Sequence, residues 1–427
     1  MTRILPLTVL ALVIWTALVV TGTLEGWWRQ PLAPFADING FQAAAIADIE
    51  KQHKGNVAFA LIANGRAVAT HFVSVGKPVD GDSRFQVASM SKWITAWGVM
   101  TLVEAGKLDL DKPVSLYLKR WKLPKGKFDN AGVTVRRLLS HTAGLTDGLG
   151  YAGFKPGDPV QRLEASLTRA ADASSGADGA VRVGIEPGTE FIYSGGGYTL
   201  LQLLVEDVSG QSFNEFMKAS VFAPLGMTRS TFLIEETGVP DVAEFFDTRG
   251  APAIHYRFAA LAATSLYTTT TDMTLFLRAH VPGPLGEAPG RGVLRPKTLL
   301  EMHRPHASQY GADIWGLGTM LYAPNNAGSF IIGHDGSNEP AINTAARLDP
   351  NTGDGIVVLE TGNRLLATVI ASEWVFWRTG NVDFLMVTYE SGALLKALAA
   401  GWTVTIAAAL FFGWRRWRYG HQVSTNP

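Results

Sequence analysis

Apolar residues follow a strand-like pattern at the start and near the end of this chain, and a helical period between. Residues 56–76 predict two strands joined by a turn at Asn64-Gly65. The segments FIIGHDGS, INTAARLDP and GIVVLETGN predict three more, with a turn at 349–355. Helical patterns cover 89–105, 134–140, 160–173, 197–208, 213–219, 271–280 and 364–378. We expect an α+β fold, an α/β sandwich, in which N- and C-terminal strands form one antiparallel sheet flanked by helices, with an inserted mostly helical subdomain.

Two uncharged apolar runs, Ile4 to Leu24 and Ala397 to Trp414, lie near the chain ends, and each is long enough to span a bilayer. The cluster Arg415, Arg416 and Arg418 follows the second run, so both tails are expected in the cytoplasm and the middle outside. A cleaved signal peptide is the alternative for the first run. The expected order is a transmembrane anchor (1–26), a linker (27–40), one domain (41–380), a linker (381–396), a transmembrane helix (397–414) and a cytoplasmic tail (415–427).

Charge and composition narrow the function classes. Lys plus Arg and Asp plus Glu both number 37, so net charge favours no nucleic-acid partner. The chain has no cysteine, which excludes disulfides and thiol chemistry. We expect no cofactor and no metal, because His303 and His306 have Pro305 between them and no accompanying carboxylate pattern. Phosphate-loop, dinucleotide-binding and Gly-x-Ser-x-Gly motifs are also missing.

A serine and a lysine stand three residues apart at two places. Ser74 and Lys77 lie at a strand end beside turn residues, so this lysine is expected in solvent. Ser89 and Lys92 open a long helical pattern, where residues i and i+3 share one face. Burial would lower the pKa of such a lysine, which could then act as a base for the serine. A helix-capping serine beside a surface lysine is the alternative, and the spacing alone does not decide.

Five blocks of the sequence resemble, in order, the serine β-lactamase and penicillin-binding-protein-like hydrolases, class C branch. The resemblance covers residues 41–380. The first block, 85–114, is similar to the family's nucleophile helix. The other four are VTVRRLLSHTAGL (133–145), PGTEFIYSGGGYTLLQLLVEDVSGQSF (187–213), FAPLGMTRSTF (222–232) and GHDGSNEPA (333–341).

The resemblance implies a role for each matching residue. Ser89 would be the acyl-accepting nucleophile, with Lys92 as its base. Tyr193 would be a second proton carrier whose phenolate Lys92 stabilises. The backbone N–H groups of Ser89 and Ser337 would form the oxyanion hole. The substrate-binding positions would be His334, Gly336, Gly195 and Asn338. His141 would be structural rather than a catalytic base.

Two positions depart from the family pattern. The Tyr-x-Asn motif reads Tyr193-Ser194-Gly195, so the amide that holds a substrate carbonyl is missing, unless Asn338 replaces it. The lysine of Lys-Thr-Gly is His334, which is mostly neutral near pH 7. Both changes remove polar anchoring for a β-lactam, and restoring Lys at 334 and Asn at 195 is expected to improve penicillin acylation if the shape of the site allows.

The sequence therefore predicts a membrane-anchored serine hydrolase that works outside the cytoplasm. Its partners would be a small ester or peptide-like amide and, through two spans, membrane lipid. The alternatives are a β-lactamase or D,D-carboxypeptidase acting on cell-wall peptides, and a non-catalytic ligand sensor. The sequence leaves the oligomeric state open.

Overall fold

Strands from both ends of the chain form one antiparallel sheet, as predicted. The computed structural model describes residues 4–234 and 241–422, and its main sheet has eight strands. In spatial order these are β2 (Arg66–Val73), β1 (Val57–Ala63), β12 (Gly355–Thr361), β11 (Ile342–Leu348), β10 (Phe330–Asn338), β9 (Met320–Pro324), β8 (Ala312–Trp315) and β7 (Ala307–Gln309). The first strand thus pairs with the last, with Val57 opposite Glu360.

The predicted hairpin turn is present between β1 and β2. Asn64 and Gly65 have φ angles of 49° and 70°, in the left-handed region that Asn and Gly tolerate best. Successive residues of β12 then point to opposite faces of the sheet. Val357 and Leu359 join one apolar cluster, and Ile356 and Val358 join the other. Because both faces are buried, the central strands read as continuous apolar runs.

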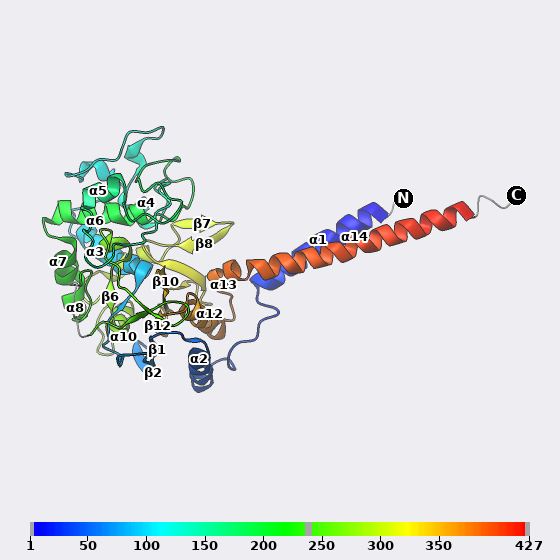
Figure 1. The fold of residues 1–427 in the computed structure, drawn as a ribbon, viewed down its shortest axis with the longest axis horizontal. Coiled ribbons are helices and arrows are strands. Elements are labelled where there is room, and N and C mark those ends of the chain that lie inside the picture. The colour runs from blue at the N-terminus through cyan, green and yellow to red at the C-terminus, as the bar shows by residue number, and fades with distance from the viewer. Residues whose placement is uncertain (1–3, 235–240, 423–427) are drawn as a thin grey trace.

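Helices cover both faces of the sheet (Figure 1). The face that carries Ile356 and Val358 is covered by α2 (Ile38–Gln52) and α12 (Leu366–Thr379). The face that carries Val357 and Leu359 is covered by α10 (Thr270–Arg278) and α3 (Ser91–Glu104). The inserted helical region contains α4 (Val135–Leu139), α5 (Leu163–Thr168), α6 (Gly195–Ser209), α7 (Phe213–Met217), α8 (Ala223–Leu225) and α9 (Leu261–Thr264). Two-stranded pairs join β3 (Phe85–Gln86) to β6 (Tyr267–Thr268) and β4 (Phe245–Phe246) to β5 (Pro252–Ala253).

Several elements differ from the sequence-based expectation. The strands β7 to β9 were not predicted. The edge strand β7 and its neighbour β8 are short, with exposed polar residues and a weak alternation. The helix α2 begins inside the expected linker 27–40, although Phe41, Ala45 and Ile49 have helical spacing. The helix expected at 160–173 is shorter in the structure. Residues 381–396 are mostly helical, through α13 (Phe384–Tyr389) and the start of α14, and α11 (Pro296–Met302) was also missed.

The two apolar helices α1 (Ile4–Leu24) and α14 (Ser391–Gln422) project side by side from the domain (Figure 1). Trp15 Nε1 donates to the carbonyl of Ala397 at 3.2 Å, and Trp402 Nε1 donates to Thr16 Oγ1 at 2.9 Å. Both helices are long and apolar enough to cross a membrane. Residues 1–3 of the expected anchor and 423–427 of the expected tail lie outside the described residues.

A buried ionic chain ties β10 to the base of α14. Asp335 of β10 pairs with Arg347 and accepts hydrogen bonds from Tyr322 Oη (2.8 Å) and Thr368 Oγ1 (2.6 Å). Arg347, which is fully buried, donates from Nε to Asp383 Oδ2 at 3.1 Å. The other oxygen of Asp383 accepts from the backbone N–H of residue 385 and so caps α13, the helix that precedes α14. Removing one partner of such a chain would leave a buried charge unpaired, which is costly. The two ion pairs therefore fix the position of β10 relative to β11 and the start of α13.

Candidate active site

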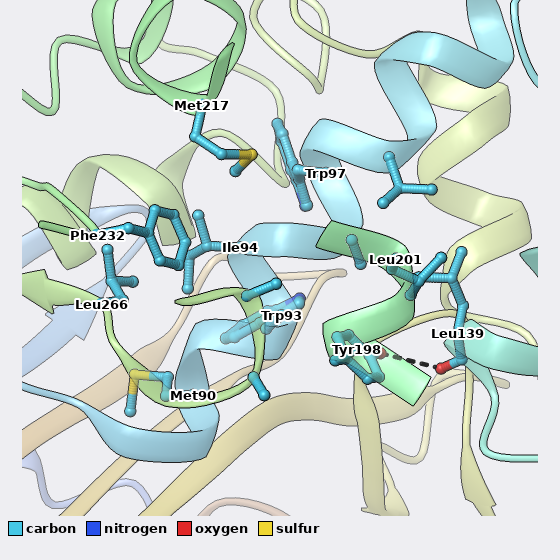
Figure 2. Close-up of a cluster of buried hydrophobic side chains, with 14 of the residues drawn as sticks. Met90, Trp93, Ile94, Trp97, Leu139, Tyr198, Leu201, Met217, Phe232 and Leu266 are labelled. Carbon is cyan, nitrogen blue, oxygen red and sulfur yellow. Dashed lines mark hydrogen bonds between the residues drawn. The ribbon is translucent and has the colours of Figure 1, made fainter. Parts of the chain in front are cut away.

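Ser89 lies in a 3-10 turn, Ala88–Met90, directly before α3. Ala88 has a φ angle of 44°, a strained value for a residue with a side chain. The surrounding structure holds this conformation, because Ser91 Oγ donates to the carbonyl of Ala88 at 2.6 Å and accepts from the N–H of Leu266 at 2.9 Å. The α3 helix behind the turn is buried on all sides, with Trp93, Trp97 and their neighbours in an apolar cluster (Figure 2). The nucleophile candidate therefore stands on a rigid support.

Lys92 is brought into contact with Ser89, as the helical spacing predicts. Its Nζ lies 3.1 Å from Ser89 Oγ and donates to the carbonyl of Ala263 at 2.7 Å. The same nitrogen lies 4.9 Å from the ring centre of Tyr193 and 5.6 Å from that of Tyr198. Only 2% of the Lys92 residue is exposed, so the alternative of a surface lysine does not hold.

Burial changes the charge state of this amine. Desolvation lowers the pKa of Lys92 from 10.5 to about 7, and the nearby charge of Asp147 opposes that shift. Near neutral pH a large fraction of Lys92 is therefore uncharged, with a lone pair available to accept the Ser89 proton. This is the property that a serine nucleophile needs in its partner.

The second Ser-x-x-Lys pair has the geometry of an ordinary turn. Ser74 Oγ accepts a hydrogen bond from the N–H of Val79 at 3.0 Å. The Lys77 side chain is 72% exposed and lies 4.0 Å from Glu244. The structure thus separates two pairs that look alike in the sequence.

Tyr193 lies beside both Ser89 and Lys92, with Lys92 Nζ 4.9 Å from its ring centre and its hydroxyl interacting with the serine side chain. The residue as a whole is 38% exposed. Burial of the hydroxyl raises the pKa of Tyr193 above its ordinary value, and the contact with Ser89 opposes this shift. The neutral phenol is favoured over the phenolate that the resemblance implied, which suits Tyr193 better as a proton donor than as the base.

Gly336 allows β10 to lie directly against the nucleophile turn. A Cβ atom at this position would be 2.0 Å from the carbonyl oxygen of Val87. That oxygen also accepts a hydrogen bond from Thr344 Oγ1 of β11 at 3.1 Å. Ser337 follows on the same strand, so its backbone lies beside the turn that carries Ser89, as the proposed oxyanion hole requires.

His334 and Asn338 lie on β10, two residues before and two residues after Gly336. His334 is buried and donates from Nδ1 to the carbonyl of Asp335 at 2.6 Å. Burial, with a smaller effect of Lys92, lowers the pKa of His334 to about 3, so the ring is neutral as expected. Asn338 Nδ2 donates to Thr264 Oγ1 at 3.2 Å, and its side-chain oxygen accepts from the N–H of Glu339. These two bonds fix the orientation of the Asn338 side chain.

The backbone of residue 149 takes the space of that asparagine. A Cβ atom at Gly195 would be 2.2 Å from the carbonyl oxygen of Leu149, which accepts the Gly195 N–H at 3.1 Å. An asparagine side chain at this position cannot fit without moving the loop. The condition that we attached to restoring Asn at 195, that the shape of the site allows it, is therefore not met while the Leu149 carbonyl keeps this position.

Other candidates have structural surroundings. His141 is buried and stacks on Tyr193, with ring centres 4.4 Å apart. His303 stacks on His280, and His306 contacts the carbonyl of Glu301. Within 4–234 and 241–422, no group of three potential metal ligands is present.

Sequence reasoning missed four residues of the site: Ala263, Asp147, Tyr198 and Trp315. Ala263 contributes only its backbone carbonyl, a group that every residue has, so nothing in the sequence marks this position. Asp147 accepts from the Oγ of Ser194, the residue that caps α6, at 2.6 Å, a pairing that spans 47 positions. The acidic residue was visible in the sequence, but nothing marked its distant partner.

Comparison with known proteins gives a consistent picture. The Beta-lactamase family model matches residues 41–371. The chain is 31% identical over 277 residues to penicillin-binding protein 4 of Amycolatopsis lactamdurans, covering 62% of this chain and 68% of that protein. It is 35% identical over 156 residues to penicillin-binding protein 4* of Bacillus subtilis, covering 36% of this chain but only 32% of that protein.

A solved structure has the same fold. The octameric penicillin-binding protein homologue from Pyrococcus abyssi superposes with a TM-score of 0.66 at 25% identity, covering 81% of this chain and 78% of that one. The family model spans well over half of the chain and includes the nucleophile turn, the tyrosine segment and β10. The chain belongs to the Beta-lactamase family, with the penicillin-binding-protein fold.

Proposed function

We propose that this chain is a membrane-anchored serine hydrolase that forms an acyl-enzyme on Ser89. The observation that carries the proposal is the contact between Ser89 Oγ and a buried Lys92 whose pKa is lowered to about 7. A serine hydroxyl with a neutral amine 3.1 Å away has both the nucleophile and the base of acyl transfer.

The reaction follows from the positions of the groups. Neutral Lys92 accepts the Ser89 proton while Oγ attacks the substrate carbonyl carbon and forms the tetrahedral adduct. The N–H groups of Ser89 and Ser337 stabilise the oxyanion. When the adduct collapses, the Tyr193 hydroxyl donates its proton to the leaving oxygen or nitrogen, and the Lys92 ammonium returns a proton to Tyr193. Water then attacks the acyl-enzyme, and the same groups transfer its proton to Ser89 Oγ.

The site favours neutral acyl groups over β-lactams. His334 stands where the family has a lysine and is uncharged, so no fixed cation at this position attracts a substrate carboxylate. Gly195 supplies no side-chain amide donor, and the carbonyl of Leu149 leaves no room for a Cβ atom at this position. A charge-assisted hydrogen bond contributes about 1.5–3 kcal/mol, so its loss weakens binding of a carboxylate-bearing substrate. We therefore propose small esters as the substrates that react best.

A D,D-carboxypeptidase or β-lactamase is the second candidate. It is supported by the relatives, which are named penicillin-binding proteins. A non-catalytic sensor would share the acylation step but not the deacylation step. The rate at which an acyl adduct disappears therefore separates the sensor from the enzymes.

The nucleophile assignment predicts that Ser89→Ala abolishes ester hydrolysis, because the variant has no oxygen to acylate. The matched control is Ser74→Ala, which changes the other Ser-x-x-Lys serine and should retain full activity. Intact-mass analysis and peptide mapping after treatment with a fluorophosphonate probe should locate the adduct on Ser89. An adduct on Ser74 or Ser265 would contradict the assignment.

The lowered pKa of Lys92 predicts a pH-dependent rate. Below the pKa of Lys92 the amine is protonated and cannot accept the serine proton, so kcat/KM for an aryl ester should rise with pH. The midpoint should lie at about 7, with a plateau at higher pH. His334→Gln should leave this midpoint in place, because His334 is already neutral throughout the range. A flat profile between pH 5 and pH 9 would exclude Lys92 as the titrating base.

The polar anchoring of the site predicts hydrolysis of short-chain aryl esters and poor turnover of penicillins and cephalosporins. His334→Lys should raise the rate of penicillin acylation, measured by intact mass. Gly195→Asn should instead destabilise the fold by about 1–3 kcal/mol, the usual cost of overpacking, because of the Leu149 carbonyl. Cephalosporin hydrolysis with kcat/KM well above that for esters would favour the β-lactamase candidate.

We further propose that α1 and α14 both span the membrane, with the hydrolase domain outside the cytoplasm. Support comes from the two apolar helices and from Arg415, Arg416 and Arg418 near the end of α14. A tag added after Pro427 should resist protease added to intact cells. A mature N-terminus near Glu25 would instead show that the first helix is a cleaved signal.

A further inference from the structure

His141 contacts both neighbours of Tyr193. The carbonyl of His141 accepts a hydrogen bond from the N–H of Ile192 at 2.8 Å, and Nδ1 accepts one from the N–H of Ser194 at 3.0 Å. His141 has a φ angle of 57°, in the left-handed region, where histidine is uncommon. The strained backbone thus directs a carbonyl and a ring nitrogen at the same short segment.

The imidazole ring also packs against the tyrosine itself. The ring centres of His141 and Tyr193 are 4.4 Å apart, with an interplanar angle of 31°. On its other sides the imidazole contacts Tyr198 at 5.2 Å and the edge of Trp315 at 4.8 Å. Both of these rings donate a hydrogen bond to the carbonyl of Leu139, at 3.1 Å and 3.2 Å, and the first of these bonds is drawn in Figure 2. The wall behind His141 is therefore fixed.

The charge state of the ring agrees with a structural contact to Ser194. Nδ1 can accept the amide hydrogen only when it carries no proton. Burial, with a smaller effect from Lys92, lowers the pKa of His141 well below its usual range, so the ring stays neutral. The remaining proton is then on Nε2, which has no hydrogen-bond partner among the described residues.

Tyr193 needs such support because its own segment of chain leads into a run of glycines. Gly195, Gly196 and Gly197 begin α6, and a glycine segment restricts its neighbours little. The asparagine side chain of the family motif is absent here, and the tyrosine residue is 38% exposed. Ser194, the cap of α6, donates from Oγ to Asp147 at one end of the segment, and the Tyr193 ring lies against His141 at 4.4 Å, Lys92 Nζ at 4.9 Å and Trp315 at 5.7 Å. Of these three groups, His141 is the one that also accepts hydrogen bonds from the N–H groups of Ile192 and Ser194.

We propose that His141 is a positioning residue that holds the Tyr193 hydroxyl against Ser89 and affects the chemistry only through that tyrosine. The inference rests on the proposed function, since it gives Tyr193 a role in proton transfer. It goes beyond the structural role that the resemblance implied, because it makes the catalytic rate depend on one hydrogen bond and one ring contact.

A double-mutant cycle on the full-length protein in detergent tests the proposal. His141→Ala should lower kcat for an aryl ester by about 10-fold or more, within the range of acid–base catalysis, with KM nearly unchanged. In a Tyr193→Phe background the same change should lower kcat by less than about threefold, because residues acting on one proton path are not additive.

Two conservative variants separate the hydrogen bond from simple filling of space. In His141→Asn the side-chain oxygen takes the place of Nδ1, and asparagine tolerates a left-handed backbone, so most of kcat should return. In His141→Gln the polar atoms lie one bond further out, and kcat should stay low. Thermal unfolding of every variant sets the assay temperature below the lowest midpoint, so that loss of folded protein does not mimic loss of rate.

Additive effects in the cycle, or equal activity of the Asn and Gln variants, would overturn the proposal. A crystal structure of His141→Gln gives a readout that needs no activity: a displaced Tyr193 hydroxyl supports the inference, and an unmoved one refutes it. If the wild-type protein neither acquires an adduct on Ser89 nor hydrolyses esters, the proposed function fails, and the crystal structure still decides whether His141 positions Tyr193.

Discussion

The burial of one amine, Lys92 Nζ, is the constraint on which the site depends. A charged ammonium in an apolar interior is costly unless it is paired, and here it contacts a hydroxyl, one carbonyl and two aromatic rings, with Asp147 near enough to influence its charge. This surrounding is too poor in acceptors to keep the amine fully charged. The lowered pKa is the result, so the packing that stabilises the domain also makes the lysine a base.

Contacts on both faces of β10 keep this strand in place beside the amine. Above the strand, Gly336 lets it approach the carbonyl of Val87, so that the strand contacts the nucleophile turn. Below it, Asp335 is bound to the buried Arg347, which in turn pairs with Asp383 at the start of α13. The strand can therefore shift in neither direction without breaking a close contact or a buried ion pair. Precise placement of backbone donors needs this kind of rigidity.

Both apolar helices join the domain near this chain of ion pairs. Arg29, five residues after α1, pairs with Glu373 of α12 and with Glu390 at the junction of α13 and α14. Helix α13 is capped by Asp383 and leads into α14. The chain of ion pairs from Asp335 through Arg347 to Asp383 therefore ends close to the point where α1 and α14 leave the domain. The strand β10 and the two apolar helices are thus attached to the same part of the domain.

The departures from the family pattern also form a coherent set. The lysine of the site strand is replaced by a neutral His334, and the motif asparagine by a glycine whose side-chain space holds a backbone carbonyl. The second change is more than a missing side chain, since the Leu149 carbonyl leaves no room for a Cβ atom at Gly195. The sequence shows that residue 195 is a glycine, and only the structure shows that the space beside it is filled.

The sequence by itself determined the sheet built from both chain ends, the hairpin at Asn64-Gly65, the two apolar helices, and the spacing that lets Ser89 and Lys92 meet. Each depends on a local pattern: short apolar runs for strands, a turn residue pair, long uncharged runs for the helices, and two residues three positions apart. The strands β7 to β9, the partners of Arg347, the carbonyl of Ala263, and the burial and pKa of Lys92 were decided by tertiary structure. They arise where segments far apart in the chain exclude water and bring backbone groups together, and neither desolvation nor the position of a backbone carbonyl is encoded in any single residue type.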